Sequence, residues 1–196
     1  PANENTVQRM QLAQVPVTPY VPRMLAVPGL QDRLLSRFAS LMQGPFSPEQ
    51  MTACLDSLLE RYGTALMADH ERWGMELNEH PEPTASADHL RKFVERRPAG
   101  MMEYLAIATG RQLIRLRTTC EPEEGGSLTL EGVPASPRSQ QFAGTPLTIT
   151  AVANEGWEFA GWKRMEEGSA VVVVDPAHQR QMRAMFRKAG SRADLP

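Results

Sequence analysis

The chain has 196 residues, of which 22% are charged and 41% hydrophobic, and its formal net charge is −2 at pH 7. This composition is typical of a folded protein of one or two domains and not of a disordered chain. A slightly acidic chain lacks the overall basic charge of proteins that neutralise nucleic-acid phosphates, so no nucleic-acid partner is expected. No apolar run approaches the roughly 18 residues of a membrane span, so none is expected.

Three prolines mark the beginning of the chain. Pro16, Pro19 and Pro22 recur every third residue, and each fixes φ and removes a backbone donor. We therefore expect residues 1–23 to form an extended lead-in, either packed on the protein surface or free as a linker.

Residues 24–110 carry apolar side chains at the spacing of α-helices, and the first helix is expected to end at Gly44-Pro45. Ser47-Pro48-Glu49-Gln50 predicts the start of a second helix, because it offers a hydroxyl cap, a proline in the first turn and a glutamine at the capping-box position. An apolar stripe behind this start predicts a buried helix face that reaches about residue 77. The stripe consists of Met51, Cys54, Leu55, Leu58, Leu59, Tyr62, Leu66, His70 and Trp73.

A third helix is expected after a break at 80–84. Ser86 should cap this helix. Pro98 should kink or split it, because proline cannot donate an intrahelical hydrogen bond. Thr109-Gly110 marks its end.

After residue 110 the period of the apolar residues changes from 3.6 to 2. This change predicts about six short strands over 111–188 and a polar tail over 189–196. The sequence therefore predicts an α+β fold, in which an N-terminal helical bundle segment (24–110) is followed by a small antiparallel β domain. Residues expected inside this domain are Leu147, Ile149, Phe159, Trp162 and Phe186, and those expected outside are Thr148, Thr150 and Arg187.

Phe159 and Trp162 break the strict alternation of their strand. Both can be buried only if a bulge intervenes at Ala160-Gly161, where glycine permits one. Trp157 lies next to a turn and is expected to be only partly covered. We therefore regard Trp157 as the aromatic residue best suited to binding a partner.

Candidate catalytic residues are few. His70 lies on the apolar stripe and is either a general base or metal ligand, or a core histidine hydrogen-bonded to a carbonyl group. The helical zinc motif of metalloproteases needs a second histidine four residues on, but position 74 is glycine. Cys54 and Cys120 are too few for a disulfide scaffold or a cysteine-built zinc site, and Cys54 is expected to be a free core residue.

Three short motifs follow one another along the helical segment. They are Leu34-Leu35-Ser36-Arg37-Phe38-Ala39-Ser40-Leu41, then His70-Glu71-Arg72-Trp73, then Phe93-Val94-Glu95-Arg96-Arg97. In this order and spacing, residues 30–108 resemble the C-terminal part of the CotH-type spore-coat kinases, which are atypical protein kinases. The resemblance marks His70, Arg72, Trp73 and Arg97 as family motif residues, and we expect them to be structural, with Trp73 packed between helices.

A second pattern runs through the β segment. It reads Gly144-Thr145-Pro146-Leu147-Thr148-Ile149-Thr150-Ala151, then Gly156-Trp157-Glu158-Phe159-Ala160-Gly161-Trp162, then Ala184-Met185-Phe186. In this pattern residues 113–188 resemble the internalin B-repeat-like modules of bacterial surface proteins, with Trp157 where tyrosine is usual. Such modules often follow CotH-type kinase domains, so the two resemblances support each other.

The resemblance places the kinase chemistry elsewhere. In CotH-type kinases the nucleotide and magnesium are held by residues N-terminal to this helical bundle. Phosphoryl transfer needs metal-binding carboxylates and a cation on the phosphates, and this chain has no paired-Asp motif before residue 56 and no lysine before Lys92. No catalytic, cofactor-binding or metal-binding residue of the family is therefore assigned here. ATP and magnesium are implied only for a complete kinase, and whether this chain acts as an enzyme stays open.

We therefore expect the non-catalytic C-terminal region of a CotH-like kinase. Its helices would support an upstream ATP site, and its β module would contact envelope or spore-coat proteins in a secreted, cell-surface or spore-coat protein. Two alternatives stay open: a surface adhesion or carbohydrate-binding module in which Trp157 or Trp162 stacks on sugar, and a small hydrolase that uses His70. A large exposed apolar patch on the helices would indicate that a further kinase lobe packs there. A solvent-facing pair of tryptophans would favour a binding module. A cleft around His70 would favour a hydrolase.

Overall fold

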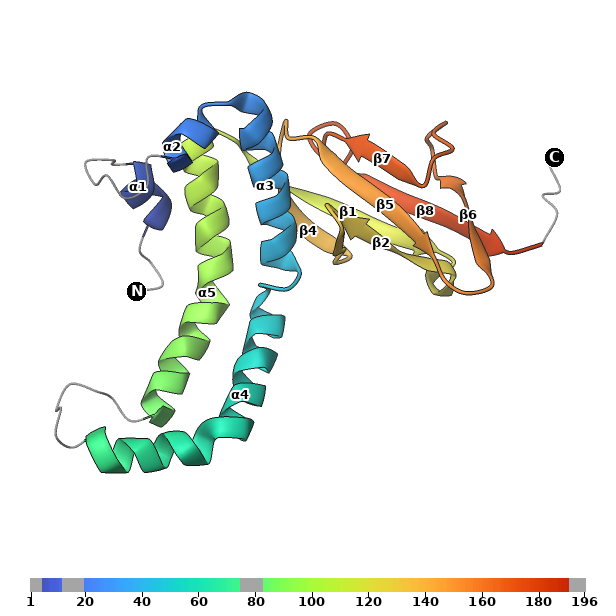
Figure 1. Ribbon diagram of the computed structural model, residues 1–196. Coiled ribbons are helices and arrows are strands. Elements are labelled where there is room, and N and C mark those ends of the chain that lie inside the picture. The colour runs from blue at the N-terminus through green and yellow to red at the C-terminus, as the bar shows by residue number, and fades with distance from the viewer. Residues whose placement is uncertain (1–4, 12–19, 75–82, 191–196) are drawn as a thin grey trace.

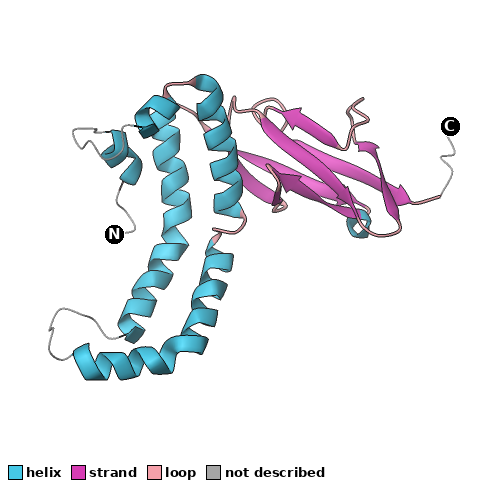
Figure 2. Ribbon diagram, viewed as in Figure 1, coloured by secondary structure: helices cyan, strands magenta, loops and turns pink. Residues whose placement is uncertain are grey.

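The computed structural model describes residues 5–11, 20–74 and 83–190. A helical part and a part built of two β-sheets lie side by side (Figure 1, Figure 2), so the predicted α+β fold class is confirmed. The helices are α1 (Thr6–Gln11), α2 (Tyr20–Leu25), α3 (Pro28–Gln43), α4 (Pro48–Asp69) and α5 (Pro83–Thr109), with a π-helical segment, η1 (His70–Gly74), directly after α4. The strands are β1 (Leu113–Glu121), β2 (Gly126–Leu130), β3 (Val133–Pro134), β4 (Arg138–Phe142), β5 (Leu147–Ala153), β6 (Trp157–Trp162), β7 (Val171–Val174) and β8 (Gln181–Lys188), with a 3-10 turn, η2 (Glu123–Gly125), before β2.

The first predicted helix ends, and the second begins, where the sequence indicates. α3 ends directly before Gly44 and buries Leu35 and Ala39. Ser47 caps α4, because its side-chain oxygen accepts a hydrogen bond from the Gln50 N–H at 3.4 Å. The predicted extension to residue 77 ends within the described residues at η1, and residues 75–82 lie outside them.

The third predicted helix, α5, ends at Thr109 as predicted but begins earlier than expected. It begins at Pro83, so Ser86 lies inside the helix and not at its cap. Proline suits a first helical turn, where its missing N–H would have no intrahelical partner. Pro98 lies inside α5 and does not split it. The helix continues through Pro98 because α1, α3 and α4 all contact α5 and hold it in place.

The prediction of an extended lead-in over residues 1–23 is wrong where the structure describes it. α1 is helical, and Asn5 caps it by accepting a hydrogen bond from the Gln8 N–H at 2.8 Å. Val7 of α1 is only 3% exposed and packs in the helical core. The pattern of Pro16, Pro19 and Pro22 gave no sign of this packing, because Val7 lies before these three prolines.

The three prolines on which that prediction rested have different positions. Pro22 lies in the first turn of α2, where proline is tolerated. Pro16 and Pro19 lie outside the described residues.

The β part consists of two sheets packed face to face. One sheet has the strand order β4-β1-β8-β6 and the other β3-β2-β5-β7. Neighbouring strands pair antiparallel as predicted, with the exception of β1 and β8, which are parallel. The core between the sheets consists of Leu116, Leu128, Leu130, Leu147, Ile149, Ala151, Trp162, Val172, Val174, Met182, Ala184 and Phe186.

The predicted bulge in β6 is confirmed. The register between β6 and β8 shifts between Phe159 and Gly161, and Gly161 has φ 134°, a conformation that favours glycine. As a result Trp162 is buried at 4% exposure, while Phe159 is half-buried against the same core. Trp157 is only partly covered, as predicted.

The helices pack against one end of the β4-β1-β8-β6 sheet, where Leu113 and Phe142 face each other across β1 and β4. Phe142 is 1% exposed and packs with Leu35 of α3 and Leu105 of α5. The Gln43 side chain, at the end of α3, hydrogen-bonds both the N–H and the C=O of Gln140. α3 therefore occupies the free edge of β4 as well as covering part of the sheet.

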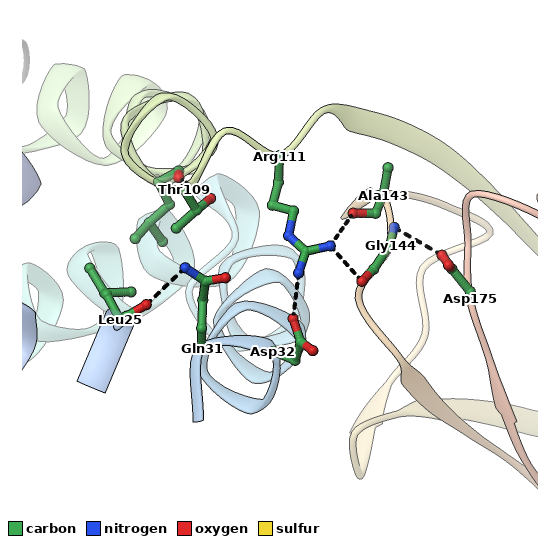
Figure 3. Close-up of polar contacts among 9 residues, drawn as sticks. Leu25, Gln31, Asp32, Thr109, Arg111, Ala143, Gly144 and Asp175 are labelled. Carbon is green, nitrogen blue, oxygen red and sulfur yellow. Dashed lines mark hydrogen bonds and ion pairs between the residues drawn. The ribbon is translucent and has the colours of Figure 1, made fainter. Parts of the chain in front are cut away.

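Arg111, between α5 and β1, joins the helical and β parts by directional contacts (Figure 3). Its guanidinium group lies 2.9 Å from the Asp32 carboxylate of α3 and donates a 2.6 Å hydrogen bond to the Gly144 carbonyl. The Gly144 N–H in turn donates to the Asp175 carboxylate at 3.0 Å. Gly144 has φ 68°, a conformation that favours glycine, and a Cβ there would displace the Arg111 guanidinium, which would lie 2.5 Å from it.

Candidate functional site

α4 is the helix whose surroundings differ most from the prediction. Its stripe is predicted to be buried, yet α4 has no buried residue. Helical spacing shows which residues share a face, but not whether another element covers that face. The exposed apolar side chains of α4, η1 and the first half of α5 are named here the hairpin apolar set. This set consists of Leu58 (49% exposed), Tyr62 (45%), Leu66 (45%), Met67 (38%), Trp73 (51%), Leu90 (49%) and Phe93 (36%).

The first part of α4 runs beside α5, the helical ribbon then bends across the end of α5 (Figure 1), and the two helices are also linked by ion pairs. The Arg91 guanidinium donates to Asp56 of α4 at 2.8 Å and to Asp88 at 3.1 Å. The hydrogen bond to Asp56, together with the nearby Asp88, raises the pKa of Arg91 above its ordinary value. Such exposed ion pairs contribute little to stability. Contact between the two helices leaves each side chain of the hairpin apolar set between 36% and 51% exposed.

The motif residues of η1 are exposed. Trp73 is 51% exposed, so the prediction that it packs between helices is wrong. Its ring instead lies 5.0 Å below the Arg72 guanidinium, a cation–π contact between neighbouring side chains. His70 is half-buried. Trp73 is exposed because η1 lies beyond the end of α4, where no described helix passes over it.

Arg97 has a structural position. It lies on α5, is half-buried, and stacks over the Phe93 ring at 5.8 Å. Its guanidinium group also donates a hydrogen bond to the Thr6 hydroxyl of α1. Arg97 therefore ties α1 to α5.

A metal or hydrolase centre at His70 gains no support from the arrangement of side chains. In the parts of the chain that the structure describes, no three His, Cys, Asp or Glu side chains form a group that could hold a metal ion. A groove of about 320 Å3 runs between α4 and α5, and one of about 810 Å3 follows the seam between α3 and the β3–β4 loops. His70 lines neither groove.

The two cysteines are both free. Cys54 is exposed on α4, so the prediction of a core cysteine is wrong, for the same reason as for the rest of the stripe. Cys120 on β1 is partly buried, and this burial, with the negative charge of Glu123, raises the pKa of its thiol. A thiol with a raised pKa is a poor nucleophile at neutral pH.

The carboxylate of Glu121, next along β1, lies among cations. Arg183 lies 2.9 Å from it and Lys163 lies 3.4 Å from it. The hydrogen bond from Arg183 and the charge of Lys163 lower the pKa of Glu121 below its ordinary value. Glu121 therefore stays ionised well into the acidic range.

The tryptophans of the β part do not form an exposed pair. Trp162 is buried, and its indole N–H donates to the Ser169 carbonyl at 2.8 Å. Trp157 packs beside Gly125, where a Cβ would lie 3.3 Å from its ring. A solvent-facing pair of tryptophans that binds sugar is therefore ruled out, because Trp162 is buried.

Comparison with known families gives two matches. Residues 2–101, which are half of the chain, match the family described as CotH kinase protein. This chain belongs to the CotH kinase family. Residues 116–190 match the family described as the divergent InlB B-repeat domain, so the CotH-family helices and the repeat module follow each other in the order that the motifs predicted. No curated protein and no solved structure matches the chain.

The CotH-family match covers the elements from α1 into α5, and the repeat match extends from β1 to the end of β8. Among the described residues, no helix is both long and apolar enough to cross a membrane.

A row of outward-facing arginines in the repeat module was not predicted as a candidate site. The signal was present, because Arg115, Arg117 and Arg183 occupy the polar positions of alternating strands.

Proposed function

We propose that the helices of this CotH-family protein support the ATP site of a CotH-type kinase, and that its β module binds a partner at the cell envelope or spore coat. The observation that carries the first half of the proposal is the exposed hairpin apolar set. Seven large apolar side chains, each 36–51% exposed on one helical hairpin, are more than the singly scattered ones usual on a protein surface, and such sets are typical of sites where another protein packs.

The energetics favour a permanent contact. Leu58, Tyr62 and Leu66 follow one another four residues apart along α4 and are each about half exposed. Covering the exposed half of such a side chain is worth about 1 kcal/mol. The whole set therefore offers several kcal/mol to a partner surface. Packing of this kind would also stabilise α4, because helices in proteins gain most of their stability from packing of an apolar face.

The chemistry also favours a supporting role. Phosphoryl transfer requires carboxylates that hold magnesium and a cation on the phosphates. The first lysine of the chain is Lys92, and it is exposed on α5. We therefore assign ATP and magnesium to a kinase part that contacts the hairpin apolar set, and not to these helices. The two family matches support an extracellular, cell-surface or spore-coat location.

The test uses two acidic substitutions, Leu58→Glu and Leu66→Glu, in two proteins. One protein is this chain alone, and the other is the chain joined to the product of the coding sequence that precedes it in its gene. In the chain alone we expect each substitution to lower the unfolding free energy by no more than about 1 kcal/mol, because about half of each side chain is already exposed. In the longer protein we expect loss of ATP binding and of autophosphorylation.

Ile107→Glu is the matched control, because Ile107 is 76% exposed on α5 and lies outside the hairpin apolar set. It should change neither protein. Unchanged ATP binding in the longer protein with both substitutions would contradict the proposal. So would a preceding coding sequence without metal-binding aspartates.

A further inference from the structure

The β4-β1-β8-β6 sheet has an outer face that the helices cover only near Phe142. Beyond that end, the pleat turns every second residue of each strand outward, and the strand registers show which of these residues are neighbours. We name this open region the basic face. Its cations are Arg115, Arg117, Arg138, Lys163, Arg183 and Arg187.

The basic face carries an excess of positive charge on a chain whose net charge is −2. Glu158 pairs with Arg187 at 2.6 Å, and Glu121 is shared by Arg183 and Lys163. Among the described residues, the side chains of Arg115, Arg117 and Arg138 have neither an ion pair nor a hydrogen bond. Three guanidinium groups are therefore free to bind an anion.

Two of these three arginines occupy directly opposed positions on neighbouring strands. Arg117 and Arg138 face each other across the antiparallel pair of β1 and β4. Like charges at such opposed positions destabilise a sheet. Arg115 lies two residues along β1, about 7 Å away at the rise of a strand. An anion between these groups would replace repulsion by charge-assisted hydrogen bonds.

A small basic pocket lies at the other side of the same face. It has a volume of about 200 Å3 and is lined by Lys163, Arg164, Gln179, Gln181 and Arg183. Sites for drug-sized ligands have volumes of about 300–1,000 Å3, so this pocket is smaller. Three cations and two amides around so small a space suit a single tetrahedral oxyanion.

We propose that the basic face binds a protein segment that carries several phosphate groups, with one phosphate in the pocket and another between Arg117 and Arg138. Arginine dominates the face, and its planar guanidinium group matches phosphate oxygens with two parallel hydrogen bonds. A kinase transfers phosphate to protein hydroxyl groups. The inference rests on the proposed function only for the source of these phosphates.

Other polyanions fit the face less well. Single-stranded nucleic acids need aromatic side chains for stacking, and the described outward residues of the basic face include none. Stable binding to a membrane surface combines basic charge with apolar side chains that insert among the lipids. Met185, the apolar residue that faces outward from β8, is half-buried.

The test measures binding of the full chain to a synthetic serine-rich peptide with three phosphoserines, by fluorescence anisotropy at several salt concentrations. The same peptide without phosphate is the ligand control. We expect phosphate-dependent binding that weakens as salt is added. The triple variant Arg115→Gln, Arg117→Gln, Arg138→Gln should bind about tenfold more weakly or worse, because each lost contact is a hydrogen bond to a charged group.

A charge-matched control keeps this result specific. The triple variant Arg33→Gln, Lys92→Gln, Arg96→Gln removes three exposed cations from the helices and should bind within about twofold of the unchanged chain, because its charges lie elsewhere. Replacing Arg115, Arg117 and Arg138 with lysine should weaken binding, because lysine keeps the charge but loses the planar fork. Circular dichroism verifies that each variant is folded.

Glu121→Gln tests for stronger binding, because it removes the carboxylate that pairs with Lys163 and Arg183. We expect tighter binding by a few-fold, and unchanged binding would contradict the role of the pocket. Equal binding of the unphosphorylated peptide, equal loss in both glutamine triple variants, or tighter binding of single-stranded DNA, heparin or phosphatidylserine vesicles would overturn the proposal. Binding of the phosphopeptide needs no ATP site. A failure to bind it would therefore not bear on the proposed role of the helices, and a failure of the helix experiment would not bear on phosphopeptide binding.

Discussion

Replacing Phe142 with alanine should weaken the joint between the helical and β parts. Phe142 lies on β4, is 1% exposed, and packs with Leu35, Met102 and Leu105 of the helices. Because side chains from several elements enclose it, they cannot all move in to fill the space. Removal of a buried phenylalanine side chain costs about 3–5 kcal/mol. At about 2–4 °C per kcal/mol for a chain of this size, the unfolding midpoint should fall by roughly 6–20 °C.

The assay is denaturant unfolding, with far-UV circular dichroism reporting the helices and near-UV circular dichroism reporting the β core around Trp162. In Phe142→Ala we expect the helical signal to be lost at a lower denaturant concentration than the β-core signal, because the β core lies on the other face of the sheet. Ile107→Ala is the control, with a change within about 0.5 kcal/mol for an exposed residue. A loss below about 1 kcal/mol in Phe142→Ala would refute the assignment of this residue as the joint.

Three further predictions concern other parts of the chain. Trp73→Ala should change the unfolding free energy by less than about 1 kcal/mol, whereas Trp162→Ala should cost about 3–5 kcal/mol; equal losses in thermal unfolding would contradict the burial that separates them. Glu121 has a lowered pKa in the folded state, so it stabilises the fold above its ordinary pKa of 4.5 and this stabilisation is lost as the pH falls through the lower, folded value. Unfolding midpoints measured from neutral to acidic pH should therefore fall more steeply for the unchanged chain than for Glu121→Gln, and identical slopes would be the contrary result. The chain alone should transfer no phosphate from labelled ATP with magnesium or manganese to a generic protein, and incorporation above a heat-killed control would show that it holds its own catalytic residues.

Local chemistry in the sequence determined a large part of the β module. Alternation assigned Leu147 and Ile149 to the core, because successive strand residues face opposite sides. The broken parity between Phe159 and Trp162 required a bulge, and Gly161 was the residue able to form it. The Ser47 cap was equally predictable, since hydroxyl capping depends on residues only three positions apart.

The tertiary structure alone decided which predicted faces are covered. The predicted stripe has a regular helical period, yet Leu58, Leu66 and Trp73 stay about half exposed, although α5 packs along α4. In the same way Val7 is buried, because α5 happens to lie against α1. Period specifies that residues share a face, while burial depends on segments far away in the chain.

The candidate sites follow the same division. The arginines of the strands were visible in the sequence at polar positions, but the opposition of Arg117 to Arg138 depends on the register between β1 and β4. The pocket of Lys163 and Arg183 likewise depends on the pairing of β6 with β8. Register is set by long-range packing and not by the composition of one strand, so the sequence supplied the charges and the fold decided which of them meet.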